Sequence, residues 1–396
     1  MRRYLVGGAV RDRLLGRPVA ERDWVVVGAS PDELLAAGYR RVGRDFPVFI
    51  HPDTGEEHTL ACRVRGDLAT AGPDVTLDDD LRGRDLTVNA LAEDVDGHVI
   101  DCTGGLPDLA ARVLRHTDAQ AFASDPLRVL RTARLAAELA PLGFRVADGT
   151  GALIRELARA GALNRLTPER IWKELVRALQ ASAPQRFFAE LHELGALAPV
   201  LPEIDRLWGI PQPAHWHPEI DTGVHTLMVL EQAARLGADP VVRFAALTHD
   251  LGKGMTPPDI LPSHRGHAER GAGIVDALCD RLRAPARFRE LARLVARYHG
   301  HIHRAAELRP GTLLDLLEAI DAFRRPERLD RVLLACEADY RGRLGFEDRP
   351  YPQAGRVREA FRAARAVDAS AIAGSAPERV ADALRQARVA AIRRLG

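Results

Sequence analysis

Two acidic residues and a pair of glycines near the N-terminus could bind a metal and a phosphate. Glu21 and Asp23 precede an apolar run, and residues two apart on a strand point to the same face. Two such carboxylates repel one another unless a cation lies between them, and Mg2+ prefers oxygen ligands and bridges substrate phosphates. Gly7 and Gly8 let backbone N–H groups approach a phosphate at the start of a helix, within reach of Arg11. These residues predict metal-dependent chemistry on a phosphorylated substrate.

A second group of residues has the ligand types of a transition-metal site. His225, the pair His249–Asp250 and Asp339 follow one another in the order H…HD…D. Imidazole and carboxylate ligands suit a transition metal rather than Mg2+, and such a metal lowers the pKa of its bound water. Three further histidines could complete this site or bind phosphate: His264, His267 and His299. The pattern predicts a hydrolytic site separate from the first.

The elements that must position these residues change character along the chain. Apolar and β-branched runs predict short strands at residues 4–6, 24–27, 48–50 and 57–61, and helices at 10–15 and 31–37, the second with Ser30 as N-cap. From about residue 119 the strand signal fades, and helical spacing follows at 127–139 and 171–179, the latter opened by Thr167 and Pro168. We expect a small α/β head followed by an all-α remainder.

Composition limits the remaining choices. The 396 residues are too many for one compact core, and 46% hydrophobic with 28% charged residues is ordinary for a globular protein. Because no apolar run could span a bilayer and no signal peptide is evident, we expect a cytoplasmic protein without membrane contact. The four cysteines are scattered and read as reduced thiols. The net charge of +1 does not itself indicate nucleic acid, although Arg128, Arg131 and Arg134 recur at helical spacing and form one basic face.

Four stretches of the N-terminal part resemble the successive motifs of one enzyme family. They are residues 4–12 (YLVGGAVRD), 23–28 (DWVVVG), 84–91 (RDLTVNAL) and 125–131 (DPLRVLR). In this order they are similar to the motifs of bacterial class II CCA-adding enzymes and of the related poly(A) polymerases. The resemblance covers about the first 140 residues and implies a head with the palm fold of polymerase-β-like nucleotidyltransferases.

The resemblance assigns roles to residues that match the motifs. Gly8 and Arg11 match the contacts to the nucleotide phosphates, and Glu21 with Asp23 match the Mg2+ ligands. The remaining nucleotide-binding arginines would be Arg84, Arg131 and Arg134. The substrates implied are CTP, ATP and tRNA.

Asp125 and Arg128 match the pair that reads the incoming base in this family. The hydrogen-bond chemistry agrees, because a carboxylate only accepts and a guanidinium only donates. Cytosine and adenine both present an amino donor beside a ring acceptor. Uracil and guanine would place a carbonyl against the carboxylate and an N–H against the guanidinium, so they would be rejected partly by repulsion.

Three features differ from the usual family pattern. Glu21 stands where aspartate is commoner, and Ser124 stands where glutamate often precedes the base-reading pair. The segment 62–72 is shorter than the corresponding flexible loop, which is implicated in the switch from C to A addition. Glu57 is a candidate third carboxylate of the head.

Residues 246–254 (ALTHDLGKG) resemble the HD phosphohydrolase superfamily. A head, a helical neck and an HD domain together are similar to the CCA-adding enzymes of proteobacteria over nearly the whole chain. That resemblance implies addition and repair of the tRNA 3′-terminal CCA, together with 2′,3′-cyclic phosphodiesterase, 2′-nucleotidase and phosphatase activities. It also implies Ni2+ at the HD site and a monomer or homodimer.

The expected domains are a nucleotidyltransferase head at 1–140, a helical neck contacting RNA and nucleotide at 141–210, an HD domain at 211–340 and a helical tail at 341–396. Three other functions are compatible with part of this pattern. A poly(A) polymerase would carry the same head motifs but not the HD domain. A protein uridylyltransferase would need regulatory domains for which the chain has no room. A non-catalytic RNA-binding module would not need Glu21, Asp23 and Arg84.

Overall fold

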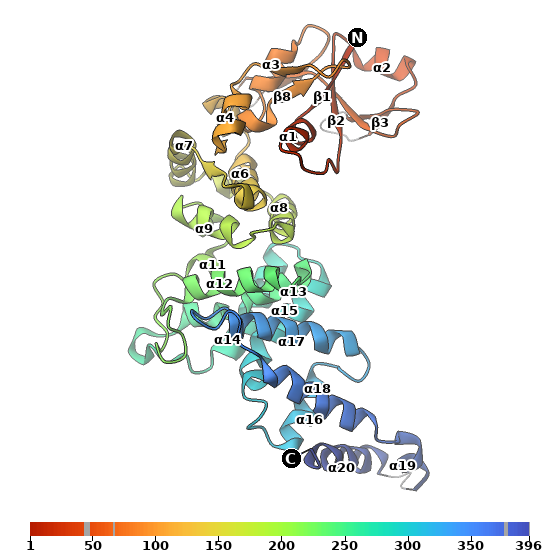
Figure 1. Ribbon diagram of the computed structural model, residues 1–396, viewed down its shortest axis with the longest axis vertical. Helices are drawn as coiled ribbons and strands as arrows, with labels where there is room; N and C mark the ends of the chain where they lie inside the picture. The colour runs from red at the N-terminus through yellow and green to blue at the C-terminus, as the bar shows by residue number, and fades with distance from the viewer. Residues whose placement is uncertain (43–47, 66–67, 376–378, 396) are drawn as a thin grey trace. The chain divides into compact units, whose positions relative to one another are not determined.

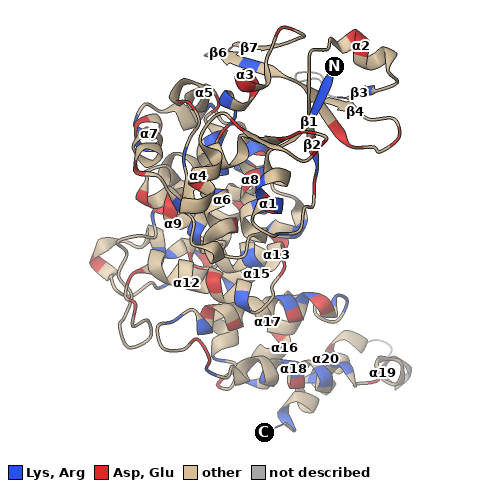
Figure 2. Ribbon diagram, turned by 45° about the horizontal axis from the view of Figure 1, so that its top comes forward, with Lys and Arg blue, Asp and Glu red and all other residues tan. Residues whose placement is uncertain are grey.

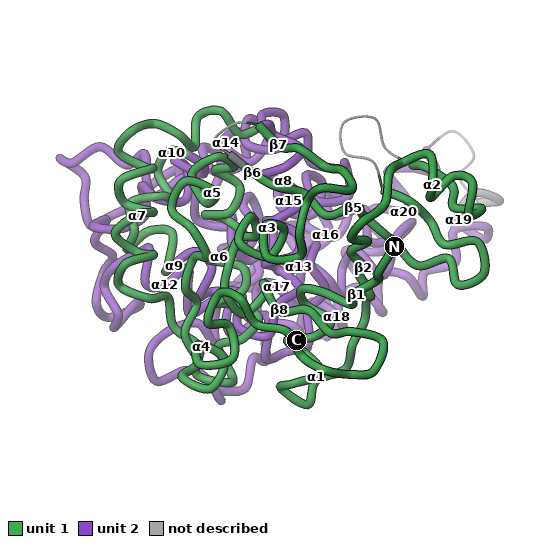
Figure 3. The backbone as a smooth tube through the Cα atoms, turned by 90° about the horizontal axis from the view of Figure 1, so that it is seen from above, with its two compact units in different colours: residues 1–166, 190–199 green, residues 167–189, 200–396 purple. Residues whose placement is uncertain are grey.

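The computed structural model describes residues 1–42, 48–65, 68–375 and 379–395. The chain divides into two compact units (Figure 3). The first comprises residues 1–166 and 190–199, and the second comprises residues 167–189 and 200–396. A mixed sheet with flanking helices forms in the first unit, and helices make up the second (Figure 1). The predicted α/β head and helical remainder are therefore confirmed.

The first unit is built on a seven-stranded sheet. Its strands, in spatial order, are β3 (Arg40–Val42), β4 (Val48–Ile50), β5 (Glu57–Leu60), β2 (Asp23–Val27), β1 (Arg2–Val6), β8 (Leu91–Glu93) and β9 (Val99–Asp101). Strand β2 runs antiparallel to β1 and parallel to β5. Val25 belongs to a hydrophobic cluster on one face of the sheet, and Val26 belongs to a cluster on the other. Both faces of β2 are covered, which explains why its sequence is continuously apolar.

Short helices and two small strand pairs complete the first unit. The helices are α1 (Gly8–Leu14), α2 (Pro31–Ala36), α3 (Leu77–Arg82), α4 (Gly105–Ala111), α5 (Ala119–Ser124), α6 (Leu127–Leu139), α7 (Asp148–Arg159) and α10 (Leu197–Val200). The 3-10 turns are η1 (Thr87–Asn89), η2 (Ala140–Leu142) and η3 (Ala162–Arg165). The strand pairs are β6 (Cys62–Arg65) with β7 (Leu68–Ala71), and β10 (Val113–Leu114) with β11 (Arg145–Val146).

Local sequence signals agree with these elements at most positions. Ser30 caps α2 and forms a capping box with Glu33, and α6 has the predicted bounds. Thr167 occupies the N-cap of the next long helix, but its side chain makes no capping hydrogen bond there. The segment 62–72, expected as a flexible loop, contains the antiparallel pair β6–β7, while residues 66–67 within it lie outside the described part of the chain.

The second unit is helical throughout its described residues. Its longer helices are α8 (Pro168–Gln180), α12 (Thr222–Arg235), α13 (Pro240–Thr248), α14 (His267–Arg281), α15 (Ala286–His303), α16 (Pro310–Ala319), α17 (Pro326–Arg341), α18 (Pro352–Arg365) and α20 (Val380–Arg393). Shorter elements are α11 (Pro202–Asp205), η4 (Leu251–Met255), η5 (Pro258–Ile260) and α19 (Ala369–Ser375), and α9 (Gln185–Glu193) crosses the boundary between the units. Not one helix in the described ranges has the length and apolarity needed to cross a membrane.

Helix α13 forms the centre of the second unit, packed by α12, α15, α17 and α8. Its Phe244 is fully buried and meets the rings of Trp172 and Phe288 edge to face. Arg243 donates to the carbonyl oxygens of Leu179 and Ala181 and so satisfies the C-terminal end of α8. This buried helix ends next to His249 and Asp250, two residues of the predicted hydrolytic site.

Candidate active sites

The sheet of the first unit brings the glycine turn and the acidic residues to one end. Val6, the last residue of β1, pairs with Asp23, and Asp23 pairs on its other side with Glu57 of β5. Gly7 follows Val6 directly and is the N-cap residue of α1. Asp23 and Glu57 are exposed, as is Glu21, which lies two residues before the strand position of Asp23. The carboxylates and the helix N-terminus thus occupy neighbouring positions across three strands.

Gly7 has two structural reasons to lack a side chain. Its φ of +74° lies in the left-handed region, which side chains disfavour. A Cβ there would also lie 3.2 Å from Nη1 of Arg84. At Gly8 a Cβ would approach Nη2 of Arg11 at 3.4 Å. The paired glycines therefore let two of the predicted nucleotide-binding arginines approach the backbone at the start of α1.

Both of these arginines are held by carboxylates. Arg11 donates through Nε and Nη2 to the two oxygens of Asp12 at 3.0 and 2.9 Å, and through Nη1 to Oδ1 of Asn89 at 2.6 Å. Arg84 lies 3.0 Å from Oδ2 of Asp80. These bonds fix the guanidinium planes beside the glycine turn.

Asp85 joins the arginines of the head into one network. Its carboxylate lies 2.9 Å from Nε of Arg131 and accepts from the Leu86 amide at 2.8 Å and from Nδ2 of Asn89 at 3.2 Å. Burial alone would raise its pKa, but the charge of Arg131 and the other donors lower the pKa to about 2. Sequence reasoning quoted the stretch that contains Asp85 and Asn89 without assigning them a role.

The two predicted base-reading residues lie at the start of α6. Arg128 donates to the carbonyl oxygens of Arg84 and Gly83 at 2.8 and 2.6 Å, and burial lowers its pKa although Asp85 and Asp125 oppose that shift. Asp125 accepts from the Leu127 amide at 3.2 Å. One turn after Arg131, Arg134 is buried and pairs with Glu138. Thus Arg128 and Arg131 join the Asp85 network, and Arg134 has a separate partner.

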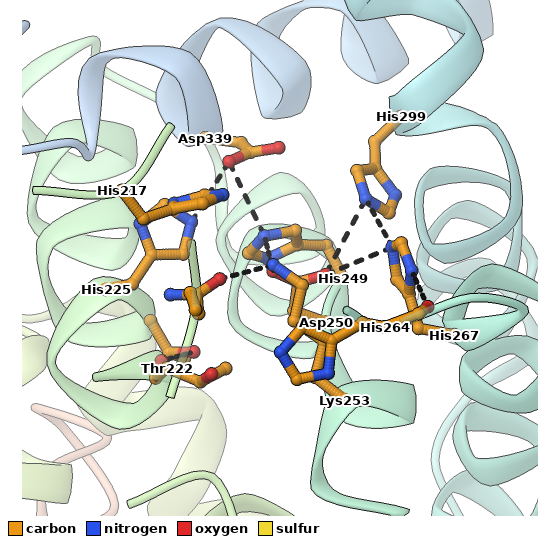
Figure 4. Close-up of polar contacts among 12 residues, drawn as sticks. His217, Thr222, His225, His249, Asp250, Lys253, His264, His267, His299 and Asp339 are labelled. Carbon is orange, nitrogen blue, oxygen red and sulfur yellow. Dashed lines mark hydrogen bonds and ion pairs between the residues drawn. The ribbon is translucent and has the colours of Figure 1, made fainter. Parts of the chain in front are cut away.

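In the second unit, three helices bring the residues of the H…HD…D pattern together (Figure 4). His225 lies on α12, His249 and Asp250 follow α13, and Asp339 lies on α17. Oδ1 of Asp339 is 3.1 Å from Nε2 of His225 and 3.6 Å from Nε2 of His249. Nε2 of His249 is 3.1 Å from Oδ2 of Asp250. All four residues are almost fully buried.

A second arrangement lies on the other side of Asp250 (Figure 4). Oδ1 of Asp250 is 3.6 Å from Nε2 of His267 and 3.6 Å from Nε2 of His299, and these two nitrogens are 3.3 Å apart. His264 does not join this group. Its Nε2 bonds to the Pro211 carbonyl oxygen and its Nδ1 to the Thr256 hydroxyl, so both ring nitrogens already have partners.

Backbone carbonyl oxygens set the tautomer of three of the clustered histidines. Nδ1 of His249 and His267 donates to the carbonyl oxygens of Ala246 and His264, and Nδ1 of His299 donates to that of Val295. A carbonyl oxygen cannot donate, so in each of these rings, when neutral, Nε2 carries the lone pair. His225 differs, because its Nδ1 faces the Glu219 carboxylate at 2.8 Å and its Nε2 faces the Asp339 carboxylate at 3.1 Å.

The same cluster contains buried atoms that lack hydrogen-bond partners. Among them are Nε2 of His249 and Oδ1 of Asp250. Buried polar atoms are rarely left in this state, and a cation would satisfy both. Burial would lower the pKa of His249, but the charges of Asp250 and Asp339 raise it to about 9, so a protonated His249 ring carries the positive charge between these carboxylates. The donor set of imidazole and carboxylate fits a divalent transition metal.

Further residues around this site were missed by sequence reasoning. Lys253 places Nζ 2.6 Å from Oδ2 of Asp250 and also donates to Gln212. His217 lies 3.1 Å from Glu219, and burial lowers the pKa of His217 to about 4. Lys253 could have been found from its position within the stretch 246–254, three residues after Asp250. His217 and Glu219 could have been found because they lie only a few residues before His225.

Comparison with known families assigns names to these parts. Residues 3–115 match the poly A polymerase head domain, residues 143–207 match a probable RNA and SrmB-binding site of polymerase A, and residues 222–343 match the HD domain. The fold and the two clusters therefore define a nucleotidyltransferase head joined to an HD domain.

The chain is 58% identical to the multifunctional CCA protein of Thioalkalivibrio sulfidiphilus, over 100% of this chain and 98% of the relative. It is also 58% identical to the multifunctional CCA protein of Methylococcus capsulatus, over 100% of this chain and 95% of the relative. The chain belongs to the family of multifunctional CCA proteins. Its nucleotidyltransferase and HD domains imply dependence on divalent metal ions.

Solved structures share the fold at lower identity. The CCA-adding enzyme of Bacillus stearothermophilus in complex with CTP matches with a TM-score of 0.65 and 24% identity, over 99% of this chain and 88% of the other. The CCA-adding enzyme of Thermotoga maritima complexed with tRNA matches with a TM-score of 0.64 and 18% identity, over 98% of this chain and 86% of the other.

Proposed function

We propose that this chain adds and repairs the 3′-terminal CCA of tRNA, using CTP and ATP as substrates. The observation that carries the proposal is the alignment of Val6, Asp23 and Glu57 across three strands, with the Gly7–Gly8 turn directly after Val6. Acidic ligands and phosphate-binding amides then lie side by side. Full-length relatives that are named multifunctional CCA proteins support the same conclusion.

Each group of the head has a role in this reaction. The Gly8 backbone, Arg11 and Arg84 bind the triphosphate, and Arg131 and Arg134 complete the nucleotide site. Glu21 and Asp23 would hold Mg2+, with Glu57 beside them. Mg2+ held there would lower the pKa of the attacking hydroxyl and stabilise the leaving pyrophosphate. The tRNA 3′-hydroxyl attacks the α-phosphate, so a new phosphodiester bond forms as the bond to pyrophosphate breaks.

Base choice is assigned to Asp125 and Arg128. Arg128 is held on the carbonyl oxygens of Gly83 and Arg84, which sets the direction of its guanidinium. Asp125 lies three residues earlier, before the first turn of α6. A fixed donor beside an acceptor selects cytosine and adenine over uracil and guanine.

The decisive experiment supplies tRNA lacking CCA, tRNA ending in C and tRNA ending in CC with each labelled nucleoside triphosphate separately. We expect CTP to extend the first two substrates and ATP to add a single residue to the third. A poly(A) polymerase would instead add many residues from ATP alone to any RNA 3′ end. A non-catalytic RNA-binding module would bind these RNAs without extending them.

The second unit is proposed to be a phosphohydrolase with 2′,3′-cyclic phosphodiesterase, 2′-nucleotidase and phosphatase activities. His225, His249, Asp250 and Asp339 would hold a divalent transition metal, with Ni2+ as the family expectation. His267 and His299 would hold a second ion together with Oδ1 of Asp250, or the two imidazoles would bind the substrate phosphate themselves. A metal held by these residues would lower the pKa of water and so supply a nucleophile for hydrolysis near neutral pH.

The test of this site is hydrolysis of adenosine 2′,3′-cyclic phosphate by chelator-treated protein after addition of Ni2+, Co2+, Mn2+ or Mg2+. We expect transition metals to restore activity and Mg2+ to restore little. Restoration by Mg2+ alone would contradict the assignment of imidazole ligands. Measuring activity as metal is added, in molar equivalents of the protein, distinguishes a site for one ion from a site for two.

The domain division at residues 140, 210 and 340 is also a proposal, as are a cytoplasmic site of action and a monomer or homodimer. The family matches at 3–115, 143–207 and 222–343 support separate head, neck and HD segments. Limited proteolysis, with mass spectrometry of the fragments, tests the boundaries. Light scattering on the purified chain gives the oligomeric state.

A further inference from the structure

A chain of hydrogen bonds leads from the HD cluster to the start of α18. Oδ1 of Asp339 faces His225 and His249, while Oδ2 of the same carboxylate receives a bond from Nε2 of His303 at 2.6 Å. Nδ1 of His303 in turn lies 2.9 Å from the hydroxyl of Tyr351. These two residues are outside the H…HD…D pattern and come from the end of α15 and the residue before α18.

The chemistry of the groups fixes the direction of these bonds. A carboxylate can only accept, so Nε2 of His303 carries the proton. In the neutral ring Nδ1 then accepts, and the Tyr351 hydroxyl donates to it. Because Oδ2 of Asp339 is engaged in this way, Oδ1 is the oxygen that remains directed at the cluster.

The surroundings of Tyr351 keep this arrangement in place. Tyr351 is 7% exposed, and its ring lies against that of Tyr340 on α17. Prolines at 350 and 352 flank it, and each restricts the backbone at or next to Tyr351. Burial raises the pKa of the Tyr351 hydroxyl, which therefore stays a donor.

We propose that Tyr351 and His303 are positioning residues that hold Asp339 with one oxygen turned to the cluster, and that they thereby set the metal affinity of the HD site. The inference rests on the proposed hydrolytic function of the second unit and extends it to two further residues. Partners of this kind, which orient a ligand without touching the metal, commonly contribute tenfold to a hundredfold in affinity.

The experiment measures metal affinity directly on the full-length chain. Chelator-treated protein is titrated with Co2+ by calorimetry, and the visible absorption of bound Co2+ reports ligand geometry. The variants are His303→Leu, His303→Gln, whose amide can donate near the position of Nε2, and Tyr351→Phe, which removes only the hydroxyl. Tyr298→Phe is the matched control, because Tyr298 lies on the same helix but contacts Arg297 and His301.

We expect His303→Leu to weaken Co2+ binding about tenfold to a hundredfold and to change its spectrum. Tyr351→Phe should weaken binding about threefold to tenfold, as expected for one lost hydrogen bond. His303→Gln should recover most of the affinity lost in His303→Leu, and Tyr298→Phe should match the unmodified chain. Melting temperatures in chelator are measured in parallel, because a merely structural role would lower them and leave Co2+ affinity unchanged.

Unchanged Co2+ affinity and spectrum in His303→Leu would overturn the positioning role while leaving the proposed hydrolase intact. Equal losses in His303→Gln and His303→Leu would also overturn it, because the donated N–H would then not matter. Failure of the unmodified chain to bind any transition metal would remove the hydrolase and the positioning role together.

Discussion

Arg11 and Arg84 each lie beside the Gly7–Gly8 turn, and each is already paired with a carboxylate. A guanidinium that is held in one orientation loses little conformational freedom when a phosphate binds. Binding at this proposed nucleotide site must compete with Asp12 and Asp80, which favours polyanionic ligands such as triphosphates. At the scale of single residues, the two arginines are already held in place beside the turn.

The acidic residues of the head give the first prediction. Asp23→Ala should abolish incorporation of both CTP and ATP, because it removes an anchor of the catalytic Mg2+. Glu21→Asp should retain activity, since it restores the commoner family ligand. Filter binding of labelled product on tRNA lacking CCA measures both variants. Comparable turnover by Asp23→Ala in a folded protein would rule out its role.

Base selection gives the second prediction. Asp125→Ala and Arg128→Ala should lower the rate and also weaken discrimination against UTP and GTP. Unmatched polar groups at such a site cost about 1–3 kcal/mol each, so selectivity should fall roughly fivefold to a hundredfold or more. Competition between CTP and UTP is the measurement. If both variants keep the selectivity of the unmodified chain, this pair does not read the base.

At the scale of elements, one buried carboxylate joins three segments of the head. Asp85 precedes η1, bonds Arg131 of α6, and reaches Arg11 of α1 through the Asn89 amide. The amide suits this position because it donates to the carboxylate and accepts from the guanidinium. The orientation of α1 and α6 therefore depends on the charge of Asp85.

This dependence gives the third prediction, on pH. The pKa of Asp85 is depressed to about 2, so its contribution to stability is complete above its unfolded pKa near 4 and is lost as pH falls toward 2. The loss should amount to about 2–3 kcal/mol. Urea unfolding of the unmodified chain and of Asp85→Asn, followed by circular dichroism from pH 6 to pH 2.5, isolates this group. The variant should lose less stability over that range, and parallel curves would contradict the assignment.

Particular elements explain how far sequence alone could predict the structure. The apolar run at 24–27 predicts β2, because a strand buried on both faces has consecutive apolar residues. The spacing at 127–139 predicts α6, because a helix buried on one face has apolar residues three and four positions apart. The pair β6–β7 was missed because pairing depends on a partner strand. The link between Tyr351 and His303 joins residues 48 positions apart and leaves no local pattern.

The residues of the candidate sites also divide into those that a local sequence pattern indicates and those whose contacts form only in the fold. Glu21, Asp23, His249 and Asp250 could be proposed from the sequence because their types and spacing occur beside a glycine turn and an apolar strand, or within the stretch at 246–254. Asp85, Asn89, Glu219 and Lys253 were not assigned, because their roles arise from contacts that form only in the fold. His264 is a histidine like the clustered residues, but both of its ring nitrogens are hydrogen-bonded to Thr256 and Pro211 and do not face the cluster.

At the scale of the whole molecule, the two candidate sites belong to different compact units. The head residues lie within 1–166, and the HD cluster lies within 200–396. The fourth prediction follows from this separation. His249→Ala or Asp250→Ala should eliminate hydrolysis of cyclic phosphate while CCA addition persists. Both activities are measured on one preparation, with Asp23→Ala as the reciprocal variant, and loss of both activities in a folded His249 variant would contradict independent sites.

The C-terminal segment bears on how tRNA is bound. Residues 341–396 contain twelve arginines and six acidic residues, although the whole chain has a net charge of +1. Basic residues lie along α18 and α20 (Figure 2). Two arginines of α18 already have partners: Arg358 pairs with Asp330 at 2.9 Å, and Arg356 donates to the Leu395 carbonyl oxygen at 3.4 Å. Arg358 is exposed and Arg356 is half-buried, so a phosphate can compete most readily for Arg358.

The fifth prediction is that this surface contributes diffuse phosphate contacts to tRNA binding. Double-helical RNA is recognised largely through its shape and backbone, which suits an enzyme that must serve every tRNA. Replacing Arg356, Arg358 and Arg362 by glutamine should weaken tRNA binding and reduce its salt dependence, because each lost phosphate contact lowers the slope of log affinity against log salt by about one. CTP binding should change little.

Substitution is preferable to truncation before residue 351 for this test. Truncation would remove Tyr351 and with it the bond to His303, so the HD cluster would be altered together with the tail. It would also uncover the apolar faces of α15 and α16 that pack against α18.

The matched control replaces Arg289, Arg293 and Arg297 on α15, which removes the same charge from another helix of this unit. Equal affinities and equal salt slopes for the α18 variant and the unmodified chain would exclude this surface from tRNA binding, whereas equal losses in both variants would show that only total charge matters.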